Sequence, residues 1–464
     1  MPDLRRRSSD WVRLMLLLAL ASLAAVVVAH ADSMPGESIP VASTLEDPAE
    51  RTRVSLLDNG LTVLTLEDHS TPVVSFQMWV HVGSRDESRY TGLAHLFEHM
   101  MFKGSKHIAE EQHAKLVQAR GGRLNAFTSR DFTVYFEDVP PESLPLVIDL
   151  EAERITNLDI SEATLTSERE VVLEERRMRT EDSPEGRAFE SLMALSFQAH
   201  PYRWPVIGWR SDIEQAPVSV AAEFFETYYA PNNITIAIAG DFDTEATLDR
   251  IRLRFGKLKP AEIPRNPTLE PEQRGIRRAV FEMDVRSSLL AAAWHAPKSG
   301  HPDGPALDVL SQILSDGRSS RLYRKLIYEG ELALSANGAY WELVDGGVFY
   351  AFAGVRPGVS VNKVETKLFA EIARLRDEPV RDQELVKAKR QLEVMLVTGL
   401  RTNHALASRI GREYATFGRI RTLAEQLEGI QSVTAADVQR VAAKYLVDDK
   451  KSVVHVVPPA GEGS

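Results

Sequence analysis

The chain has 464 residues, of which 44% are hydrophobic and 26% are charged. This length and composition are sufficient for two domains of roughly 200 residues each. The formal net charge of −11 excludes a protein that attracts nucleic acid by charge, and the lack of cysteine excludes disulfides and thiolate metal ligands.

The N-terminal segment has the pattern of a secretory signal peptide over residues 1–31. Residues 5–13 carry four arginines, residues 14–28 are apolar, and Ala31 is a small residue at the expected cleavage point. An uncleaved membrane anchor is the alternative, although the apolar run is short for a span. We expect export to the periplasm with no membrane anchor after cleavage, and a flexible polar leader at residues 32–50.

The first half of the chain combines strand and helix patterns. Alternating and continuous apolar runs predict strands over 61–68, 73–83, 133–139 and 233–242. Apolar residues with helical spacing predict helices over 89–102, 142–157, 161–180 and 185–199.

Residues 255–275 form the best candidate for an interdomain linker, because they contain four prolines and few apolar residues. Beyond this segment the pattern begins again, with strands predicted over 278–285 and 288–297 and helices over 306–316 and 319–330.

The two halves also end alike. Residues 218–240 and 433–458 each join an amphipathic helix ending in a tyrosine to a polar turn and a β-branched strand. This similarity predicts an internal duplication rather than a solenoid, since the period is long. We therefore expect an α+β fold of two homologous domains, at 51–254 and 276–464, each a mixed or antiparallel sheet packed with helices.

The helix predicted over residues 89–102 carries the strongest chemical signal. His95 and His99 are four residues apart, and Glu98 directly precedes the second histidine. On a helix these three side chains share one face. Two neutral imidazoles and a carboxylate at one point are what a divalent metal with a bound water needs. The order His-x-x-Glu-His is an inverted form of the commoner zinc-helix motif.

A third metal ligand is expected on the helix predicted over 161–180. Helical spacing places Glu175 on an apolar face with Val171, Val172 and Met178, and Glu168 lies two turns earlier on the same face. Carboxylates on an apolar face require a positive charge opposite them, which a zinc ion would supply.

These residues resemble the pitrilysin/insulinase family of zinc metallopeptidases over about residues 50–458. "GLAHLFEHMMFKGS" is similar to the zinc helix of that family, and "HPYRWPVIG" matches a recurrent family segment. "GGRLNAFTSRDFTVYF" resembles its active-site edge strand, with Asn125, Ala126 and Phe127 toward the substrate. The resemblance implies peptide substrates bound along this strand by β-augmentation.

The resemblance also implies roles for the metal residues. His95, His99 and Glu175 would hold one zinc ion per chain, Glu98 would be the general base, and Glu168 would orient a zinc-bound histidine or balance its charge. Glu168 as an ordinary helix carboxylate remains an alternative, as does Asn125 as a turn residue without a substrate role. His107 and His113 lie in a polar segment and are expected to be solvated.

The chain departs from the family in its second half. Active members often carry an Arg and a Tyr there, seven residues apart, and the matching positions hold Ile327 and Leu334, which cannot donate a hydrogen bond. Arg321 and Tyr328 have the required spacing but lie six residues early. The family includes heterodimers in which a homologous subunit supplies the Arg/Tyr pair.

The resemblance therefore implies a zinc endopeptidase that forms the zinc-bearing subunit of a heterodimer and cleaves peptides or short unfolded segments, and the signal-peptide pattern predicts that it is exported. A homodimer using Arg321 and Tyr328 is the less favoured arrangement. A non-catalytic structural or assembly subunit, and a processing peptidase for one dedicated peptide, are the rival functions.

Overall fold

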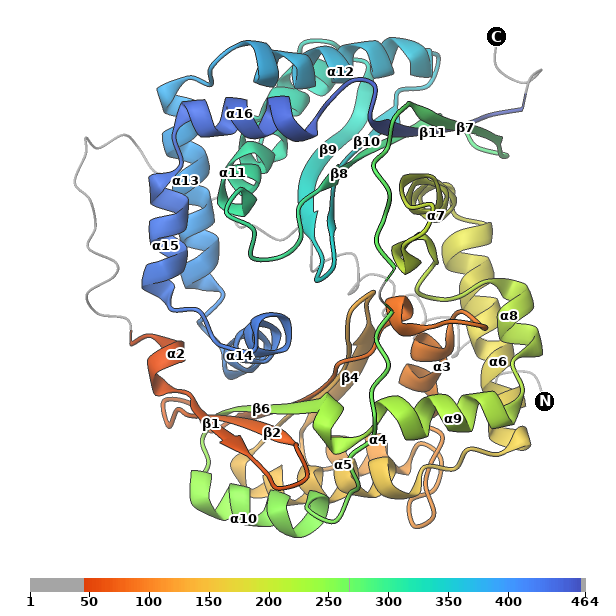
Figure 1. Ribbon diagram of the computed structural model, residues 1–464, viewed down its shortest axis with the longest axis vertical. Coiled ribbons are helices and arrows are strands. Elements are labelled where there is room, and N and C mark those ends of the chain that lie inside the picture. Colours follow the sequence, from red (N-terminus) through yellow and green to blue (C-terminus); the bar gives the residue numbers. More distant parts are fainter. Residues whose placement is uncertain (1–45, 267, 460–464) are drawn as a thin grey trace, which may run out of the picture. The chain divides into compact units, whose positions relative to one another are not determined.

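The computed structural model describes residues 46–266 and 268–459, in which two β-sheets are packed with helices (Figure 1). The predicted signal peptide and most of the predicted leader lie outside the described residues. The last leader residues are not loose, because helix α2 spans Pro48–Arg51 and Asp47 accepts a 2.6 Å hydrogen bond from the amide of Leu423. Within the described residues, no helix combines the length and apolar character that a membrane crossing requires.

The first sheet has six strands in the order β1-β2-β6-β3-β5-β4. Only β2 and β6 run parallel, so the sheet is mixed, and β1 and β4 form its two edges. The strands are β1 Arg53–Leu56, β2 Thr62–Glu67, β3 Val74–Val80, β4 Arg123–Thr128, β5 Thr133–Val139 and β6 Ile234–Gly240.

Helices of the first half cover this sheet through one large apolar core, to which β3, β6 and the metal-motif helix all contribute. Both β3 and β6 are buried at every position. In β3 the buried residues include the polar Ser75 and Gln77, and the Gln77 amide donates hydrogen bonds to the carbonyl of His404 and the hydroxyl of Ser408. The helices of the first half are α3 Leu93–Met100, α4 Gln112–Gln118, α5 Leu144–Asn157, α6 Glu162–Arg176, α7 Pro184–Ser196, α8 Arg210–Gln215, α9 Val218–Tyr228 and α10 Thr244–Phe255. Of these, α7 buries its apolar residues in a separate cluster and not in this core.

The second sheet repeats the topology of the first. Its order is β7-β11-β8-β10-β9, parallel at β7/β11 and antiparallel elsewhere, as in β2-β6-β3-β5-β4. This repeat agrees with the predicted duplication, and the α+β fold class is confirmed. The strands are β7 Arg277–Glu282, β8 Leu289–Ala296, β9 Ala333–Glu342, β10 Gly347–Val355 and β11 Lys451–Val457, and the helices are α11 Gly304–Ser315, α12 Val361–Asp377, α13 Asp382–Thr398, α14 Asn403–Phe417, α15 Leu423–Ser432 and α16 Ala435–Tyr445.

Each half contributes one helix to the sheet of the other (Figure 1). Helix α14 packs on β3 and β6, where Gly411 is required because a β-carbon there would lie 2.3 Å from the indole nitrogen of Trp79. Helix α7 packs on β8 and β11. The two contacts form separate apolar clusters, one with Leu406, Ala407 and Ile410 on the first sheet and one with Ala188, Leu192 and Met193 on the second.

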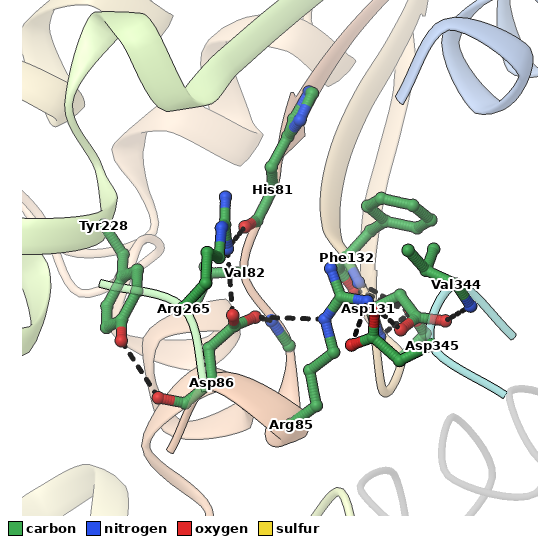
Figure 2. Close-up of polar contacts among 12 residues, drawn as sticks. His81, Val82, Arg85, Asp86, Asp131, Phe132, Tyr228, Arg265, Val344 and Asp345 are labelled. Carbon is green, nitrogen blue, oxygen red and sulfur yellow. Dashed lines mark hydrogen bonds and ion pairs between the residues drawn. The ribbon is translucent and has the colours of Figure 1, made fainter. Parts of the chain in front are cut away.

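A cluster of charged residues, of which Asp86 and Asp131 are buried, joins the two halves near the tips of their hairpins (Figure 2). Arg85 contacts Asp131 of the β4–β5 turn at 2.9 Å and Asp345 of the β9–β10 turn at 3.0 Å. The amide of Val344 donates to Asp131 at 3.2 Å. Arg265, from the segment between the sheets, contacts Asp86 at 2.9 Å. The β4–β5 hairpin is thereby attached at its tip to the second half.

Candidate metal centre

The metal motif lies on α3, as its sequence predicts. Leu96, Phe97 and Met100 are buried in the first core, which directs the motif side chains to the other side of the helix. The N-terminus of α3 is held by the buried carboxylate of Glu87, which accepts 2.8 Å hydrogen bonds from the amides of Gly92 and Ala94. Burial raises the pKa of Glu87 well above its ordinary value. These hydrogen bonds therefore fix where helix α3, which carries the motif, begins.

The structure brings the three predicted ligands together. Nε2 of His95 and Nε2 of His99 lie 3.7 Å and 3.2 Å from Oε2 of Glu175. One ligand atom from each residue falls within 4.8 Å of the other two. Ligands about 2.0–2.1 Å from a tetrahedral ion lie about 3.3 Å apart, so the donor set and its spacing fit zinc. Oε2 of Glu175 is buried with no hydrogen-bond partner in the described chain.

Glu168 contacts the ligand His99 through the ring nitrogen that points away from the metal position. Its Oε1 lies 2.8 Å from Nδ1 of His99, which directs the other ring nitrogen of His99 toward Glu175. Its Oε2 lies 3.0 Å from Nζ of Lys103. The Glu168 side chain is 6% exposed, so the carboxylate is not a solvated helix-surface group. This is the arrangement that orients a metal-binding histidine.

The ionisation of the ligands shows that the centre favours a cation. Burial and the neighbouring His99 lower the pKa of His95 to about 4. Burial also acts against charge on His99, but the neighbouring carboxylates of Glu168 and Glu175 outweigh it and raise the pKa of His99 to about 9. Likewise, contacts with His99, His95 and Arg179 overcome burial and lower the pKa of Glu175 to about 2. These shifts indicate that the three ligands together favour a positive charge between them, which a metal cation would supply.

Glu98 faces the same centre, with Oε2 4.0 Å from Nε2 of His95. Oε2 accepts a 2.7 Å hydrogen bond from the hydroxyl of Thr128, at the end of β4. Burial raises the pKa of Glu98, while Thr128 and His99 partly oppose that rise. A largely buried carboxylate with a raised pKa beside a metal position suits a group that accepts and returns a proton. Sequence reasoning missed Thr128, although strand alternation places it two residues after Ala126, on the same face.

The predicted substrate strand is β4, an edge strand that pairs with β5 alone in the described chain. Ala126 is buried toward α3, and its amide donates a 2.9 Å hydrogen bond to the Asn125 side chain. Phe127 is 38% exposed and contacts Trp79 edge-on. Successive strand residues point to opposite faces, so Asn125 and Phe127 lie on the side of the sheet away from α3.

The prediction that Glu175 lies on an apolar face is wrong in part. Val171 and Met178 are 48% and 47% exposed, whereas Val172 is buried. The α-helical period used for Met178 does not apply, because α6 ends at Arg176 and a π-helical turn spans Arg177–Glu181. The buried stripe of α6 instead consists of Leu165, Glu168, Val172 and Arg176. Glu175 borders this stripe and reaches the centre beside α3.

His113 is also placed differently from the prediction. It is 5% exposed, and its Nε2 lies 3.2 Å from Glu137 and 3.8 Å from Glu151. Burial lowers the pKa of His113 to about 3. The spacing of the three residues would admit a metal, but the guanidinium of Arg154 already contacts both carboxylates and supplies the positive charge. His107, as expected, is largely exposed.

The candidate Arg/Tyr positions do not form a donor pair at the metal centre. Ile327 packs against the second core, and Leu334 is 59% exposed on β9. Arg321 is engaged by Glu384, with two 3.1 Å hydrogen bonds, and Tyr328 is 74% exposed. None of the four makes a hydrogen bond or ion pair with the metal-centre residues within the described chain.

Comparisons with known proteins cover both halves. Residues 62–209 match the model of "Insulinase (Peptidase family M16)", and residues 219–392 match that of the "Peptidase M16 inactive domain". The zinc protease PqqE of Helicobacter pylori is 31% identical over 408 residues, covering 87% of this chain and 92% of that protein. A probable mitochondrial-processing peptidase subunit beta of Arabidopsis thaliana is 27% identical over 423 residues, covering 88% of this chain and 79% of that protein.

Among solved structures, a protease from Helicobacter pylori is similar with a TM-score of 0.84 and 30% identity, covering 88% of this chain and 99% of that chain. The similarity thus extends through fold, sequence and both sheets. The chain belongs to the insulinase family, peptidase family M16.

Proposed function

We propose that the protein is an exported, periplasmic zinc endopeptidase that binds one zinc ion through His95, His99 and Glu175. The observation that carries this proposal is the convergence of three ligand atoms beside the buried carboxylate of Glu98. Relatives named as zinc proteases support the same activity. The signal-peptide pattern of residues 1–31 supports export.

The chemistry is divided between the ion and the chain. Zinc, when bound, would polarise the scissile carbonyl and lower the pKa of a water molecule. Glu98 takes the proton of the attacking water and returns it to the leaving amine. Glu168 holds His99 in the tautomer that leaves Nε2 free for the ion.

Peptides or short unfolded segments are the proposed substrates, because β4 offers an open edge beside the centre. A peptide added to this edge would be read mainly through its main chain. The amide of Ala126 is satisfied by Asn125 in the free chain, so a peptide carbonyl would take over that hydrogen bond and release the Asn125 side chain. This exchange would give Asn125 and Ala126 a role in substrate binding, and the partly exposed ring of Phe127 would contact the same peptide.

We further propose that the chain works as the zinc-bearing subunit of a heterodimer. Ile327 and Leu334 cannot donate to an oxyanion, and Arg321 is held by Glu384. One missing donor costs about 10²–10³ in rate. A homologous subunit with Arg and Tyr should therefore raise kcat more than it lowers KM. If the purified single chain is already fully active, a homodimer becomes the better arrangement.

The test of the catalytic role is Glu98→Gln, with Glu174→Gln as its matched control. Glu174 directly precedes the ligand Glu175 in the sequence, but its side chain is exposed and paired with Arg177. Glu98→Gln should abolish peptide cleavage while the chain keeps stoichiometric zinc, and Glu174→Gln should change neither. Undiminished cleavage by Glu98→Gln would refute the proposed mechanism.

A non-catalytic structural or assembly role is the second candidate, and the family model matched by residues 219–392 favours it by its description as an inactive domain. Measuring the zinc content of the purified chain distinguishes the catalytic role from the structural role. A purified chain without stoichiometric zinc, and without zinc-dependent cleavage in the presence of a homologous subunit, would favour the structural role.

A further inference from the structure

The carboxylate of Glu98 has one hydrogen-bond donor in the described chain, the hydroxyl of Thr128. The bond is 2.7 Å long and reaches Oε2, the oxygen that also lies 4.0 Å from Nε2 of His95. The Glu98 side chain is 17% exposed, so few water molecules can replace this donor. The direction in which the carboxylate points therefore depends on Thr128.

Thr128 is itself held firmly. It is the last residue of β4 and lies opposite Thr133 of β5. The turn that follows is closed by Ser129, whose amide donates to the carbonyl of Phe132 at 2.8 Å and whose hydroxyl accepts from the amide of Phe132 at 2.9 Å. Asp131 at the tip is bound to Arg85 and to the amide of Val344 (Figure 2). The hydroxyl of Thr128 thus projects from a braced hairpin.

We propose that Thr128 is a positioning residue that fixes the carboxylate of Glu98 for proton transfer and ties it to the strand that binds the substrate. This inference rests on the proposed peptidase function. The same strand would align the peptide carbonyl and hold the base, so their relative position would be set by one rigid element. Proton transfer requires heavy atoms within hydrogen-bond reach, and a displacement of about 1 Å costs about 10²-fold in rate.

The Thr128→Val substitution tests this role with little change in shape, since it replaces the hydroxyl by a methyl group. Thr128→Ser keeps the hydroxyl and removes the methyl group. The matched control is Thr133→Val on the neighbouring strand, where the lost hydroxyl donates to the carbonyl of Val82 and not to Glu98. Zinc content should stay stoichiometric in all three variants, because none of them removes a ligand.

We expect Thr128→Val to lower kcat by about 10–100-fold with KM changed less than about twofold. Thr128→Ser should retain kcat within about threefold, because a serine hydroxyl can make the same bond. Thr133→Val should lower thermal stability and leave kcat unchanged well below its melting temperature. A Thr128→Val enzyme with wild-type kcat, or a Thr128→Ser enzyme as impaired as Thr128→Val, would overturn the proposal.

A second measurement does not depend on activity. Crystal structures of the metal-free variants should show Glu98 in the same rotamer in the wild type and Thr128→Ser, and displaced or spread over several rotamers in Thr128→Val. An unchanged Glu98 in Thr128→Val would overturn the proposal. If the wild-type chain shows no zinc-dependent cleavage, the proposed function fails, and the rotamer of Glu98 still decides whether Thr128 positions it.

Discussion

Gly92 and Gly208 lie back to back at the start of the metal-motif helix. A β-carbon on Gly208 would lie 2.5 Å from Cα of Gly92. Both glycines have positive φ, +84° at Gly208 and +90° at Gly92. Arg176, the neighbour of Glu175, donates a 2.7 Å hydrogen bond to the carbonyl of Gly208. This contact therefore joins α6, which carries one ligand, to the beginning of α3, which carries the other two.

Gly208→Ala should destabilise the protein and weaken zinc binding together. An alanine at positive φ costs about 1 kcal/mol, and the steric contact with Gly92 adds to it, so we expect a loss of about 2–4 kcal/mol in the free energy of unfolding. Gly275→Ala is the control, because no atom lies within 4 Å of a β-carbon at that position. Denaturant unfolding and zinc titration measure the two effects, and equal behaviour of the two variants would contradict the prediction.

Glu168→Gln should weaken zinc binding without removing a ligand. The hydrogen bond to Nδ1 of His99 loses its ionic partner, and such supporting groups typically account for about 10–100-fold in metal affinity. Competition with a chelator of known affinity measures the change. Glu170→Gln, an exposed neighbour on the same helix, serves as the control and should bind zinc like the wild type.

The pair of Arg321 and Glu384 should make stability depend on pH. Burial acts to raise the pKa of Glu384, but Arg321 and Arg381 outweigh it and lower the pKa from 4.5 to about 2. A lowered folded-state pKa stabilises the protein above the unfolded value, and that stabilisation is lost as the pH falls from about 4.5 to about 2. Arg321→Met should therefore cost about 1–3 kcal/mol at pH 7 and less at pH 3.

Urea unfolding of Arg321→Met and the wild type at both pH values measures this difference. A destabilisation that is the same at pH 7 and at pH 3 would show that Arg321 acts through packing rather than through its charge. The result would also decide whether Arg321 is free to serve as the missing donor, since a strongly stabilising pair with Glu384 keeps it in place.

Sequence patterns predicted the chemistry of α3 well because His95, Glu98 and His99 are close along one helix, where periodicity fixes their direction. They failed where burial arises from distant partners. His113 lies in a polar segment, yet Glu137 and Arg154 from other elements bury it as part of an ion-pair cluster. Met178 was misplaced because a π-helical turn changes the period after Arg176, and no simple sequence signal marks that change.

Introducing the family's Arg at Ile327 and its Tyr at Leu334 should change the free energy of unfolding by different amounts. Leu334 is 59% exposed, so Leu334→Tyr should leave the free energy of unfolding within about 0.5 kcal/mol of the wild type. Ile327 packs against the second core, so Ile327→Arg should cost about 1–3 kcal/mol. Thermal unfolding of each single variant tests this order, and a stable Ile327→Arg chain would contradict it.

The reciprocal placement of α7 and α14 has a consequence for how the protein can be divided. A fragment ending in the segment between the sheets would lack α14 and leave Leu64, Leu66 and Trp79 without their cover, and the complementary fragment would lack α7. Each piece would keep the core on one face of its sheet and lose the helix that covers the other face, although each repeats a complete strand topology. We therefore expect the halves to behave as complementary fragments rather than as autonomous modules, and each to be more soluble when both are produced together.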